Sequence, residues 1–354
     1  MIKELKNKED IIALLSCSPE QDEELYQTAV DIRNKTIGNK VYLRGLIEIS
    51  NTCLKNCLYC GIRKDNIDVN RYSLKEEEIY EAALFAYKRN FGSIVLQGGE
   101  RNDKKYTLFI ENVIREIKRI TDNKLGITLS LGDQTEETYK RWLDAGAHRY
   151  LLRIESSNPE LYAKIHPAGS MHSYTNRIKS LELLKKCGYQ TGSGVMIGLP
   201  FQTVEDLADD LLFLKSMDID MVGMGPYLEH ENTPLYHYRE QLKPLSERLR
   251  LGLHMIAVLR ILMPDVNIAS TTALQTIDPF GREKGLAAGA NVIMPNISPA
   301  QNRKKYTLYQ NKPFSEESDE ITINKLSESI RSCGCEIAFG EWGDPVHFAK
   351  RNKG

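Results

Sequence analysis

Residues 41–60 read VYLRGLIEISNTCLKNCLYC, an apolar run that leads directly into a loop with three cysteines. The run at 41–49 is rich in valine, leucine and isoleucine, which predicts a strand that is buried on both faces. Cys53, Cys57 and Cys60 lie within eight residues, and the other four of the seven cysteines form no comparable group. Thiolates are the usual ligands of a 4Fe-4S cube, so three of them can hold three irons and leave the fourth open. An open iron indicates a small molecule bound directly to the metal.

A zinc site is the alternative interpretation of this loop. Structural zinc takes four ligands, commonly as two Cys-x-x-Cys pairs or with histidines at fixed spacing. No histidine lies near residues 53–60. The spacing therefore favours an iron-sulfur cluster.

Seven more apolar runs follow the first, and we expect each to form a strand. They cover residues 93–97, 127–131, 149–154, 194–198, 221–224, 267–270 and 291–294. Helical patterns are expected at residues 73–87, 105–121, 136–145, 174–187, 204–215, 247–262 and 282–288. The first of these helices opens at Ser73-Leu74-Lys75-Glu76, which has the form of a capping box. Eight strands that alternate with helices predict an α/β fold, a complete (β/α)8 TIM-type barrel; the alternative is a six-stranded partial barrel with an appended domain.

We expect the barrel to span residues 41–300, between an N-terminal helical segment at 1–40 and a C-terminal extension at 301–354. The N-terminal segment has helical patterns at 9–15 and 23–32, and Gly38 ends the second. The extension is more polar and has a helical pattern at 322–332. It is expected to pack on the barrel, at a place that the sequence does not specify.

The composition excludes several classes of protein. The 354 residues include 47 Lys plus Arg and 48 Asp plus Glu. The chain therefore lacks the excess of basic residues that would indicate a nucleic-acid partner. No apolar run approaches the roughly 20 residues that span a bilayer, and Met1–Lys6 has no apolar signal segment. An odd number of cysteines, three of them in one loop, argues against a disulfide framework. We therefore expect a cytoplasmic protein without a membrane or nucleic-acid partner.

Candidate site residues follow the predicted strands, and a parallel barrel places its active site at the carboxyl ends of its strands. After the cysteine loop, these residues are Gly98, Gly99, Glu100, Ser130, Arg153, Glu155, Gly198, Leu199, Pro200, Thr271 and Thr272. Their convergence on one end of the barrel is stronger support for a site than any single residue.

Several of these residues also have plain structural interpretations. Gly98-Gly99 could be only a tight turn, since glycine adopts positive φ freely. Arg153 and Glu155 share one side of a strand and could form an internal ion pair. The pair Thr271-Thr272 is typical of β structure as well as of anion binding.

The remaining sulfur-containing side chains give weaker signals. Met196, Met224 and Met294 end three strands, where methionine commonly fills gaps in a core; Met196 is kept as a candidate at the cofactor site. Cys17 has no metal-binding partner nearby and is expected to be an ordinary buried or loop thiol, and Cys187 is expected to be structural. Cys333 and Cys335 offer two thiols, whereas an iron-sulfur cluster usually has four cysteine ligands. The seven histidines are not spaced as metal ligands usually are.

The cysteine loop resembles that of the radical S-adenosylmethionine (SAM) enzymes. Their loop reads C-x3-C-x-aromatic-C; Tyr59 supplies the aromatic residue, and Gln97-Gly98-Gly99-Glu100 follows about forty residues later. The resemblance implies that SAM chelates the open iron and is cleaved by one electron to a 5'-deoxyadenosyl radical. It also implies that Arg177 binds the SAM carboxylate, with an exposed surface arginine as the alternative, and that Glu155 accepts the ribose hydroxyls. The expected cofactor-binding set is Tyr59, Gln97, Gly98, Gly99, Glu100, Ser130, Arg153, Glu155, Arg177, Met196, Thr271 and Thr272.

Longer stretches resemble the family of FeFe-hydrogenase maturases called HydE. They lie at residues 53–66, 96–100, 128–132, 149–155, 198–203, 220–226 and 291–296. The resemblance implies a complete barrel with an internal cavity, in which the radical acts on a sulfur-containing, organometallic iron precursor of the hydrogenase di-iron centre. It implies sister maturases, a scaffold protein and a reductant such as ferredoxin or flavodoxin as partners. Some members have three more cysteines near the carboxyl terminus; this chain lacks that pattern, so one cluster is expected.

Two other interpretations stay open. A methylornithine-synthase-like or biotin-synthase-like radical SAM enzyme would act on a small organic substrate, although a biotin-synthase-like enzyme needs further cluster ligands inside the barrel. A non-catalytic iron-sulfur or zinc-binding protein belongs to another class, and it would release no 5'-deoxyadenosine from SAM.

Overall fold

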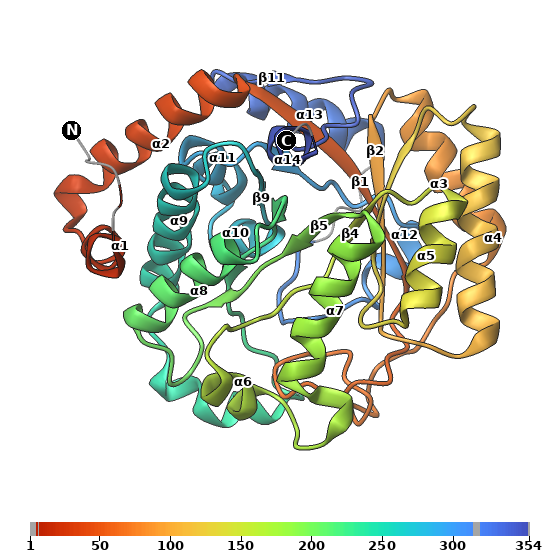
Figure 1. Ribbon diagram of the computed structural model, residues 1–354, viewed down its shortest axis with the longest axis horizontal. Coiled ribbons are helices and arrows are strands. Elements are labelled where there is room, and N and C mark those ends of the chain that lie inside the picture. Colours follow the sequence, from red (N-terminus) through yellow and green to blue (C-terminus); the bar gives the residue numbers. More distant parts are fainter. Residues whose placement is uncertain (1–4, 6, 314–318, 353–354) are drawn as a thin grey trace.

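The computed structural model describes residues 5, 7–313 and 319–352 (Figure 1). Within these residues eight parallel strands form a closed barrel, because the last strand pairs with the first at Tyr42↔Val292 and Leu43↔Ile293. In barrel order the strands are β1 (Lys40–Ser50), β2 (Ser93–Gly98), β3 (Gly126–Ser130), β4 (Arg149–Leu151), β5 (Gln190–Ser193), β7 (Met221–Val222), β9 (Asn267–Ser270) and β10 (Val292–Ile293). The predicted complete barrel is confirmed, and the six-stranded alternative is wrong.

The fifth strand begins earlier than predicted. It starts at Gln190 rather than at Gly194, and after a break it continues as β6 (Met196–Ile197), which pairs with β8 (Gly225–Pro226). The stretch 190–193 reads QTGS and is buried although it has no apolar run. Its polar groups are satisfied internally, for example by the Thr191 N–H that donates to the Asp220 carboxylate at 2.8 Å. Apolar periodicity therefore could not reveal this half of the strand.

Helices surround the barrel, as the ribbon view shows (Figure 1). The predicted ones are α3 (Glu76–Lys88), α4 (Lys104–Ile120), α5 (Glu136–Ala145), α7 (Tyr174–Cys187), α8 (Val204–Ser216), α9 (Leu245–Leu262) and α11 (Gly281–Ala287). The sequence patterns did not predict four short helices, which are α6 (Pro159–Ile165), α10 (Thr272–Ile277), α12 (Ala300–Arg303) and α14 (Val346–Arg351). None of these has more than seven residues, so hydrophobic periodicity is hard to detect in them.

The predicted capping box at Ser73 is wrong. The N-cap of α3 is Lys75, whose N–H donates to Glu78 at 2.8 Å. Ser73 instead forms an antiparallel bridge with Ser50, and their hydroxyls lie 2.9 Å apart. The contact with the end of β1 holds Ser73 outside the helix.

The two terminal segments cover different parts of the barrel, and the end of α2 (Asp22–Ile37) lies near β11 (Glu336–Ile337) (Figure 1). The N-terminal helices α1 (Lys8–Leu15) and α2 pack against α8 and α9. The C-terminal segment includes α13 (Asp319–Ser332) and β11, which extends the sheet beside the start of β1. The Gly343 carbonyl then accepts hydrogen bonds from Arg44 at 3.0 Å and Asn267 at 2.7 Å, so this segment covers the amino-terminal end of the barrel.

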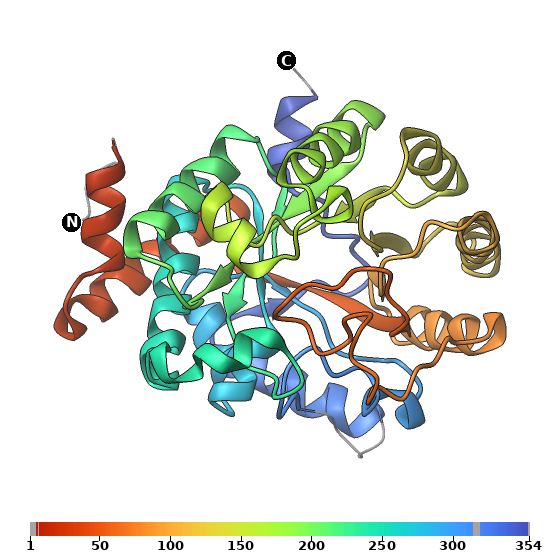
Figure 2. The same cartoon turned by 90° about the horizontal axis from the view of Figure 1, so that it is seen from below.

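The loop between β1 and α3, coloured orange-brown, crosses the opposite end of the barrel in Figure 2. This end is the carboxyl-terminal end of the strands, where the candidate residues were expected. Among the described helices, none combines the length and the apolar character needed to cross a membrane.

Candidate functional site

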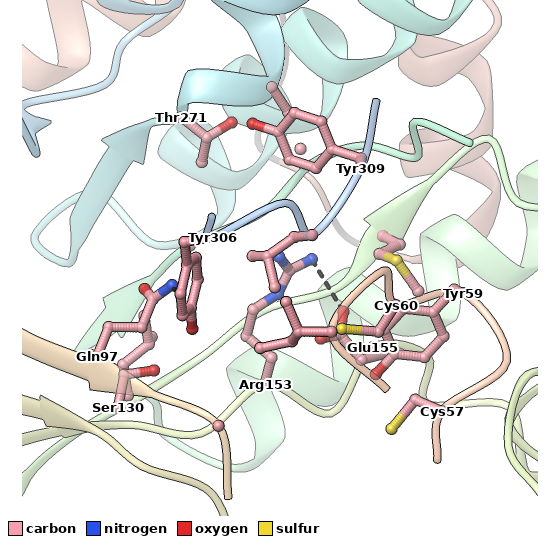
Figure 3. A pocket seen from close by; sticks show the side chains of 18 of the residues that line it. Cys57, Tyr59, Cys60, Gln97, Ser130, Arg153, Glu155, Thr271, Tyr306 and Tyr309 are labelled. Atoms are coloured by element: carbon pink, nitrogen blue, oxygen red, sulfur yellow. Dashed lines mark hydrogen bonds and ion pairs between the residues drawn. The ribbon is translucent and has the colours of Figure 1, made fainter. Parts of the chain in front are cut away.

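A cavity of about 330 Å³ lies at the carboxyl ends of the strands, and all the expected cofactor-binding and cluster residues line it (Figure 3). The predicted residues that line the cavity are Cys53, Cys57, Tyr59, Cys60, Gln97, Gly98, Gly99, Glu100, Ser130, Arg153, Glu155, Arg177, Met196, Thr271 and Thr272. They come from the ends of six different barrel strands and from α7. Parallel strands bring their carboxyl ends to one mouth, and this explains why residues so far apart in sequence share one cavity.

The three loop cysteines are free thiols that face this cavity. The Cys53 Sγ accepts the backbone N–H of Lys55 at 3.4 Å and that of Glu100 at 3.3 Å. Burial raises the pKa of the Cys57 thiol to about 12, and the neighbouring Cys53 adds to the effect. Three thiolates in one buried loop are unfavourable unless a cation lies among them, so the donor set fits an iron-sulfur cluster.

Gly99 allows the end of β2 to approach the cysteine loop. A Cβ at this position would lie 2.3 Å from the Thr52 carbonyl oxygen and 2.8 Å from the Cys53 Cβ. Neither Gly98 nor Gly99 has positive φ, so the tight-turn interpretation based on positive φ is wrong. The glycine is needed here for space rather than for backbone freedom.

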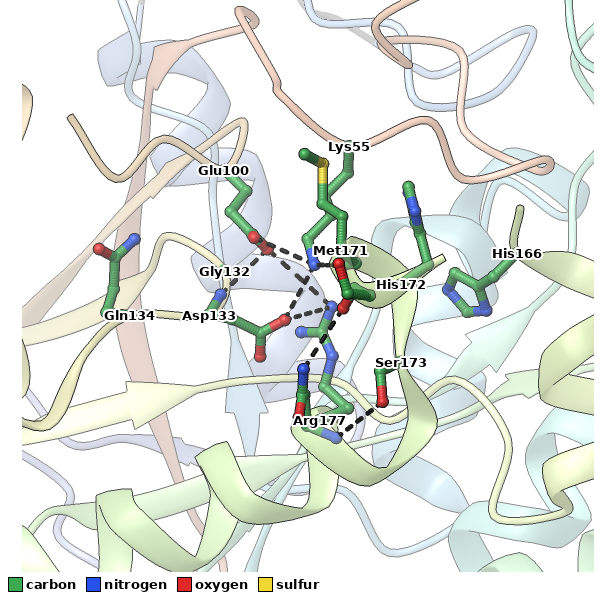
Figure 4. Close-up of polar contacts among 12 residues, drawn as sticks. Lys55, Glu100, Gly132, Asp133, Gln134, His166, Met171, His172, Ser173 and Arg177 are labelled. Atoms are coloured by element: carbon green, nitrogen blue, oxygen red, sulfur yellow. Dashed lines mark hydrogen bonds and ion pairs between the residues drawn. The ribbon is translucent and has the colours of Figure 1, made fainter. Parts of the chain in front are cut away.

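A buried network of charges lies beside the cysteine loop (Figure 4). Lys55 Nζ lies 3.2 Å from both Glu100 Oε1 and Asp133 Oδ2, and Arg177 lies 3.3 Å from the same Asp133 oxygen. The side chain of Arg177 is only 11% exposed, so its interpretation as a surface arginine is wrong. Lys55 also donates to the Met171 carbonyl, and this contact ties the loop to residues just before α7.

The pKa values of the two carboxylates in this network shift in opposite directions. Burial opposes ionisation of Asp133, yet Arg177 and Lys55 together hold its pKa below the ordinary value. Burial and the neighbouring Asp133 raise the pKa of Glu100. Sequence analysis missed Lys55 and Asp133; the available signal was their position, inside the cysteine loop and three residues after Ser130.

Arg153 and Glu155 form the expected ion pair, with Arg153 Nη2 2.9 Å from Glu155 Oε2. Arg153 also donates to the Val195 carbonyl at 2.7 Å. Glu155 has a φ of +68°, which is unusual for a residue with a side chain and is a strain typical of functional sites. Burial raises the pKa of Glu155, and the positive charge of Arg153 opposes this shift.

Tyr59 and the threonine pair lie at different parts of the wall. The Tyr59 hydroxyl lies 3.4 Å from His166 Nε2, with the two rings edge to face at a centroid separation of 5.4 Å. The Thr272 hydroxyl accepts a hydrogen bond from Arg282 at 3.2 Å. The buried Thr271 Oγ1 has no hydrogen-bond partner among the described residues, and it lies beside Tyr309 on the cavity wall (Figure 3). Such a polar atom is available to a ligand.

A segment of the C-terminal extension forms a further part of the wall, which the sequence did not reveal. Tyr306, Leu308, Tyr309 and Lys312 all line the cavity. Gln97 Nε2 donates to the Tyr306 hydroxyl at 3.3 Å, and Lys312 forms an ion pair with Glu48 of β1. We call residues 304–312 the C-terminal strap. No motif marks it, because its residues acquire a role only through contact with the barrel.

Comparisons with known proteins show the family of the chain. The family model of the Radical SAM superfamily matches residues 47–214. The FeFe-hydrogenase maturase subunit HydE of Thermotoga maritima is 46% identical over 323 residues, which cover 91% of this chain and 88% of that protein. The 3-methylornithine synthase of Methanosarcina acetivorans is 31% identical over 333 residues, 93% of this chain and 90% of that one.

A solved structure supports the same assignment. The crystal structure of methylornithine synthase superposes with a TM-score of 0.81 at 25% identity, and it covers 94% of both chains. The expected family, the enzyme class and the two cofactors are thereby confirmed. This chain belongs to the radical SAM superfamily and, within it, to the family of the FeFe-hydrogenase maturase HydE, as an enzyme that uses a 4Fe-4S cluster and S-adenosylmethionine.

Proposed function

We propose that Cys53, Cys57 and Cys60 hold the 4Fe-4S cluster of this enzyme and that SAM binds in the cavity beside them. The bound cluster supplies the electron that cleaves SAM and yields a 5'-deoxyadenosyl radical. The observation that carries this proposal is the placement of three free thiols on the wall of one cavity that the whole expected cofactor-binding set also lines, although the candidates Gly198, Leu199 and Pro200 lie outside its lining.

The side chains around the loop suit the parts of SAM. Arg177 is assigned to the SAM carboxylate, which a guanidinium can grip with two hydrogen bonds. Lys55 and Asp133 hold Arg177 and Glu100 in place through the ion pairs of the network. Glu155 is assigned to the ribose hydroxyls, since its strained backbone holds a carboxylate at the cavity wall.

The rest of the cavity is proposed as the reaction chamber. Its volume of about 330 Å³ lies within the range usual for small-ligand sites. Aliphatic side chains of Leu46, Leu151 and Met294 lie beside the polar groups of the C-terminal strap. Such a wall excludes water from a reactive carbon radical while it offers polar groups that orient a substrate.

We propose a sulfur-containing iron precursor of the hydrogenase di-iron centre as this substrate, with the product passed to a scaffold protein. The identity of 46% to HydE over most of both chains supports this assignment. Sister maturases and a ferredoxin or flavodoxin as reductant are the implied partners. Because the cluster needs a reducing environment, we place the reaction in the cytoplasm.

Two experiments test the proposal in sequence. Anaerobically reconstituted enzyme with SAM and a strong reductant should release 5'-deoxyadenosine, and no release would refute the site. A hydrogenase maturation system that lacks this chain should then yield inactive hydrogenase, and addition of the chain should restore hydrogen evolution. Normal maturation without the chain would refute the substrate but leave the radical chemistry standing.

The second candidate is methylornithine-synthase-like activity on an amino acid. The TM-score of 0.81 and the identity of 31% favour it as the alternative. Conversion of an amino acid by the reconstituted enzyme, together with no effect in the maturation system, would decide for this candidate.

A further inference from the structure

A second group of metal-ligand side chains lies outside the barrel, where the N-terminal helices meet α9. Cys17 follows α1, Asp22 opens α2, and His254 lies within α9. We propose that Cys17, Asp22 and His254 bind one zinc ion that fastens the N-terminal helices to the barrel. The sequence hides this group, because 237 positions separate Cys17 from His254.

The distances between the three ligand atoms suit such an ion. Cys17 Sγ lies 3.8 Å from Asp22 Oδ1 and 4.0 Å from His254 Nε2, and the latter two atoms are 2.8 Å apart. A triangle with these sides has one in-plane point about 2.1 Å from all three atoms, close to the bonds of about 2.0–2.3 Å that zinc makes to sulfur, nitrogen and oxygen. A small movement of the ion out of this plane leaves room for water as a fourth ligand.

The surrounding groups have the arrangement that usually supports metal ligands. His254 Nδ1 lies 3.1 Å from the Leu15 carbonyl, so its N–H donates there and Nε2 presents its lone pair toward Cys17 and Asp22. Arg250 donates to both oxygens of Asp22 at 2.7 Å and to the Cys17 carbonyl at 2.6 Å. A ligating histidine typically donates its other nitrogen to a carbonyl, and ligating carboxylates are themselves hydrogen-bonded.

The acceptor atoms of the group also favour a cation between them. With Nδ1 protonated, His254 Nε2 and Asp22 Oδ1 are two acceptors only 2.8 Å apart, and they repel unless a proton or a metal ion lies between them. A proton would satisfy this pair, and the Cys17 thiol would then donate to Asp22 Oδ1 over a long contact of 3.8 Å. A divalent ion satisfies all three atoms, and a thiolate with an imidazole selects zinc over magnesium or calcium.

Burial indicates a structural role for the ion. The His254 side chain is 1% exposed and that of Asp22 is 20% exposed, so the ion would be enclosed on the protein side and reachable by water on the other. Because the ligands come from three elements, metal binding would add to the free energy that holds α1 and α2 against α9.

Metal analysis of the anaerobically reconstituted holoenzyme tests the proposal, since the iron-sulfur cluster then occupies the loop cysteines. After equilibration with zinc chloride and removal of excess metal, the wild type should retain one zinc ion per chain. Cys17→Ser and His254→Gln should each lose it. The matched control is Cys187→Ser, another half-buried cysteine, which should retain zinc.

X-ray absorption at the zinc edge of the wild type should show one sulfur and several nitrogen or oxygen ligands. This measurement does not depend on whether the variants fold. Zinc should also raise the melting temperature of the wild type and of Cys187→Ser but not of Cys17→Ser. Cys17→Ser keeps the contacts of Asp22 with Arg250 and His254, so it should fold. Equal zinc in Cys17→Ser and the wild type would show that the bound zinc does not depend on Cys17, and no zinc in either would show that a proton alone occupies the group; each result would overturn the proposal.

Discussion

Cys57 is the middle member of the cysteine loop, and the proposed cluster has no spare ligand. Replacement by alanine should reduce 5'-deoxyadenosine formation by at least about 100-fold, since loss of one ligand weakens metal binding strongly. The measurement is a product assay on reconstituted protein, together with its iron content. Cys187→Ala is the control, because this half-buried thiol lies at the end of α7, and it should keep full activity. Full activity in Cys57→Ala would remove this residue from the cluster.

Asp210 gives a pH-dependent prediction at a residue that does not line the cavity. It is fully buried on α8, accepts the Ser157 N–H at 2.6 Å, and burial raises its pKa to about 7 from an ordinary value of 3.8. Because the folded state holds the proton more tightly than the unfolded state, stability is lost as pH rises from about 4 to about 7. The expected loss is about 2–4 kcal/mol, from about 1.4 kcal/mol per pKa unit.

Asp210→Asn keeps an acceptor for Ser157 and removes the charge, so its free energy of unfolding should lack this decline. Denaturant titrations of both proteins at pH 5 and pH 8 measure the difference. If the two proteins lose stability in parallel between these pH values, Asp210 is not the group responsible.

At the scale of elements, a buried ion pair contributes to holding the C-terminal strap against the barrel. Glu48 is 1% exposed and Lys312 is 11% exposed, and the other side-chain partner of Glu48 is Asn296 at 2.8 Å. The backbone of the strap is also bound to the cysteine loop, since the Gly61 N–H donates to the Leu308 carbonyl at 2.8 Å. The strap therefore connects the proposed cluster site with the wall of the chamber.

Lys312→Met should lower the free energy of unfolding by about 3 kcal/mol, because it leaves the Glu48 carboxylate buried without its cation. The double variant Glu48→Gln with Lys312→Met removes both charges and should recover most of this loss. Denaturant unfolding of the single and double variants measures the effect. Equal stability of the two variants would mean that the ion pair does not hold the strap.

The elements show where sequence patterns suffice and where they fail. The strand at 41–49 and the helices α4 and α9 have clear apolar patterns and were predicted within a few residues. The strand at Gln190–Ser193 was missed because buried polar groups replace the apolar residues there. The strap was missed because it has no helix or strand of its own between Lys304 and Lys312.

At the scale of the whole molecule, the two ends of the barrel are covered by different parts of the chain. The loop after β1 covers the carboxyl-terminal end, and residues 336–351 cover the amino-terminal end. Gly343 is a point of close contact in the second cover: its φ is +68°, and a Cβ there would lie 2.4 Å from Tyr42 Cγ.

Gly343→Ala should therefore destabilise the fold by about 3 kcal/mol, through a strained backbone and overpacking against β1. The matched control is Gly334→Ala, which has a φ of +70° but no atom within 4 Å of the added Cβ, and should cost only about 1 kcal/mol. Thermal or denaturant unfolding of both variants measures the difference. Equal costs would mean that this segment does not pack on the barrel end.

The sequence by itself determined the cysteine loop, the alternation of strands and helices, and the residues that follow each strand. These features depend on spacing along the chain: three thiols within eight residues need no distant partner to be recognised as a cluster site. The closed barrel then brings strand ends together as a matter of geometry, which explains why Glu100, Arg153 and Thr271 could be named in advance.

Only the tertiary structure decided the contacts between segments far apart in the chain. The pairing of Lys312 with Glu48 and the meeting of Cys17 with His254 join positions more than 200 residues apart. No local period or motif encodes such pairs, because each is set by how whole elements pack. The proposed cluster site could therefore be predicted from one loop of the sequence. The far wall of the proposed reaction chamber and the proposed zinc site could be found only in the folded chain.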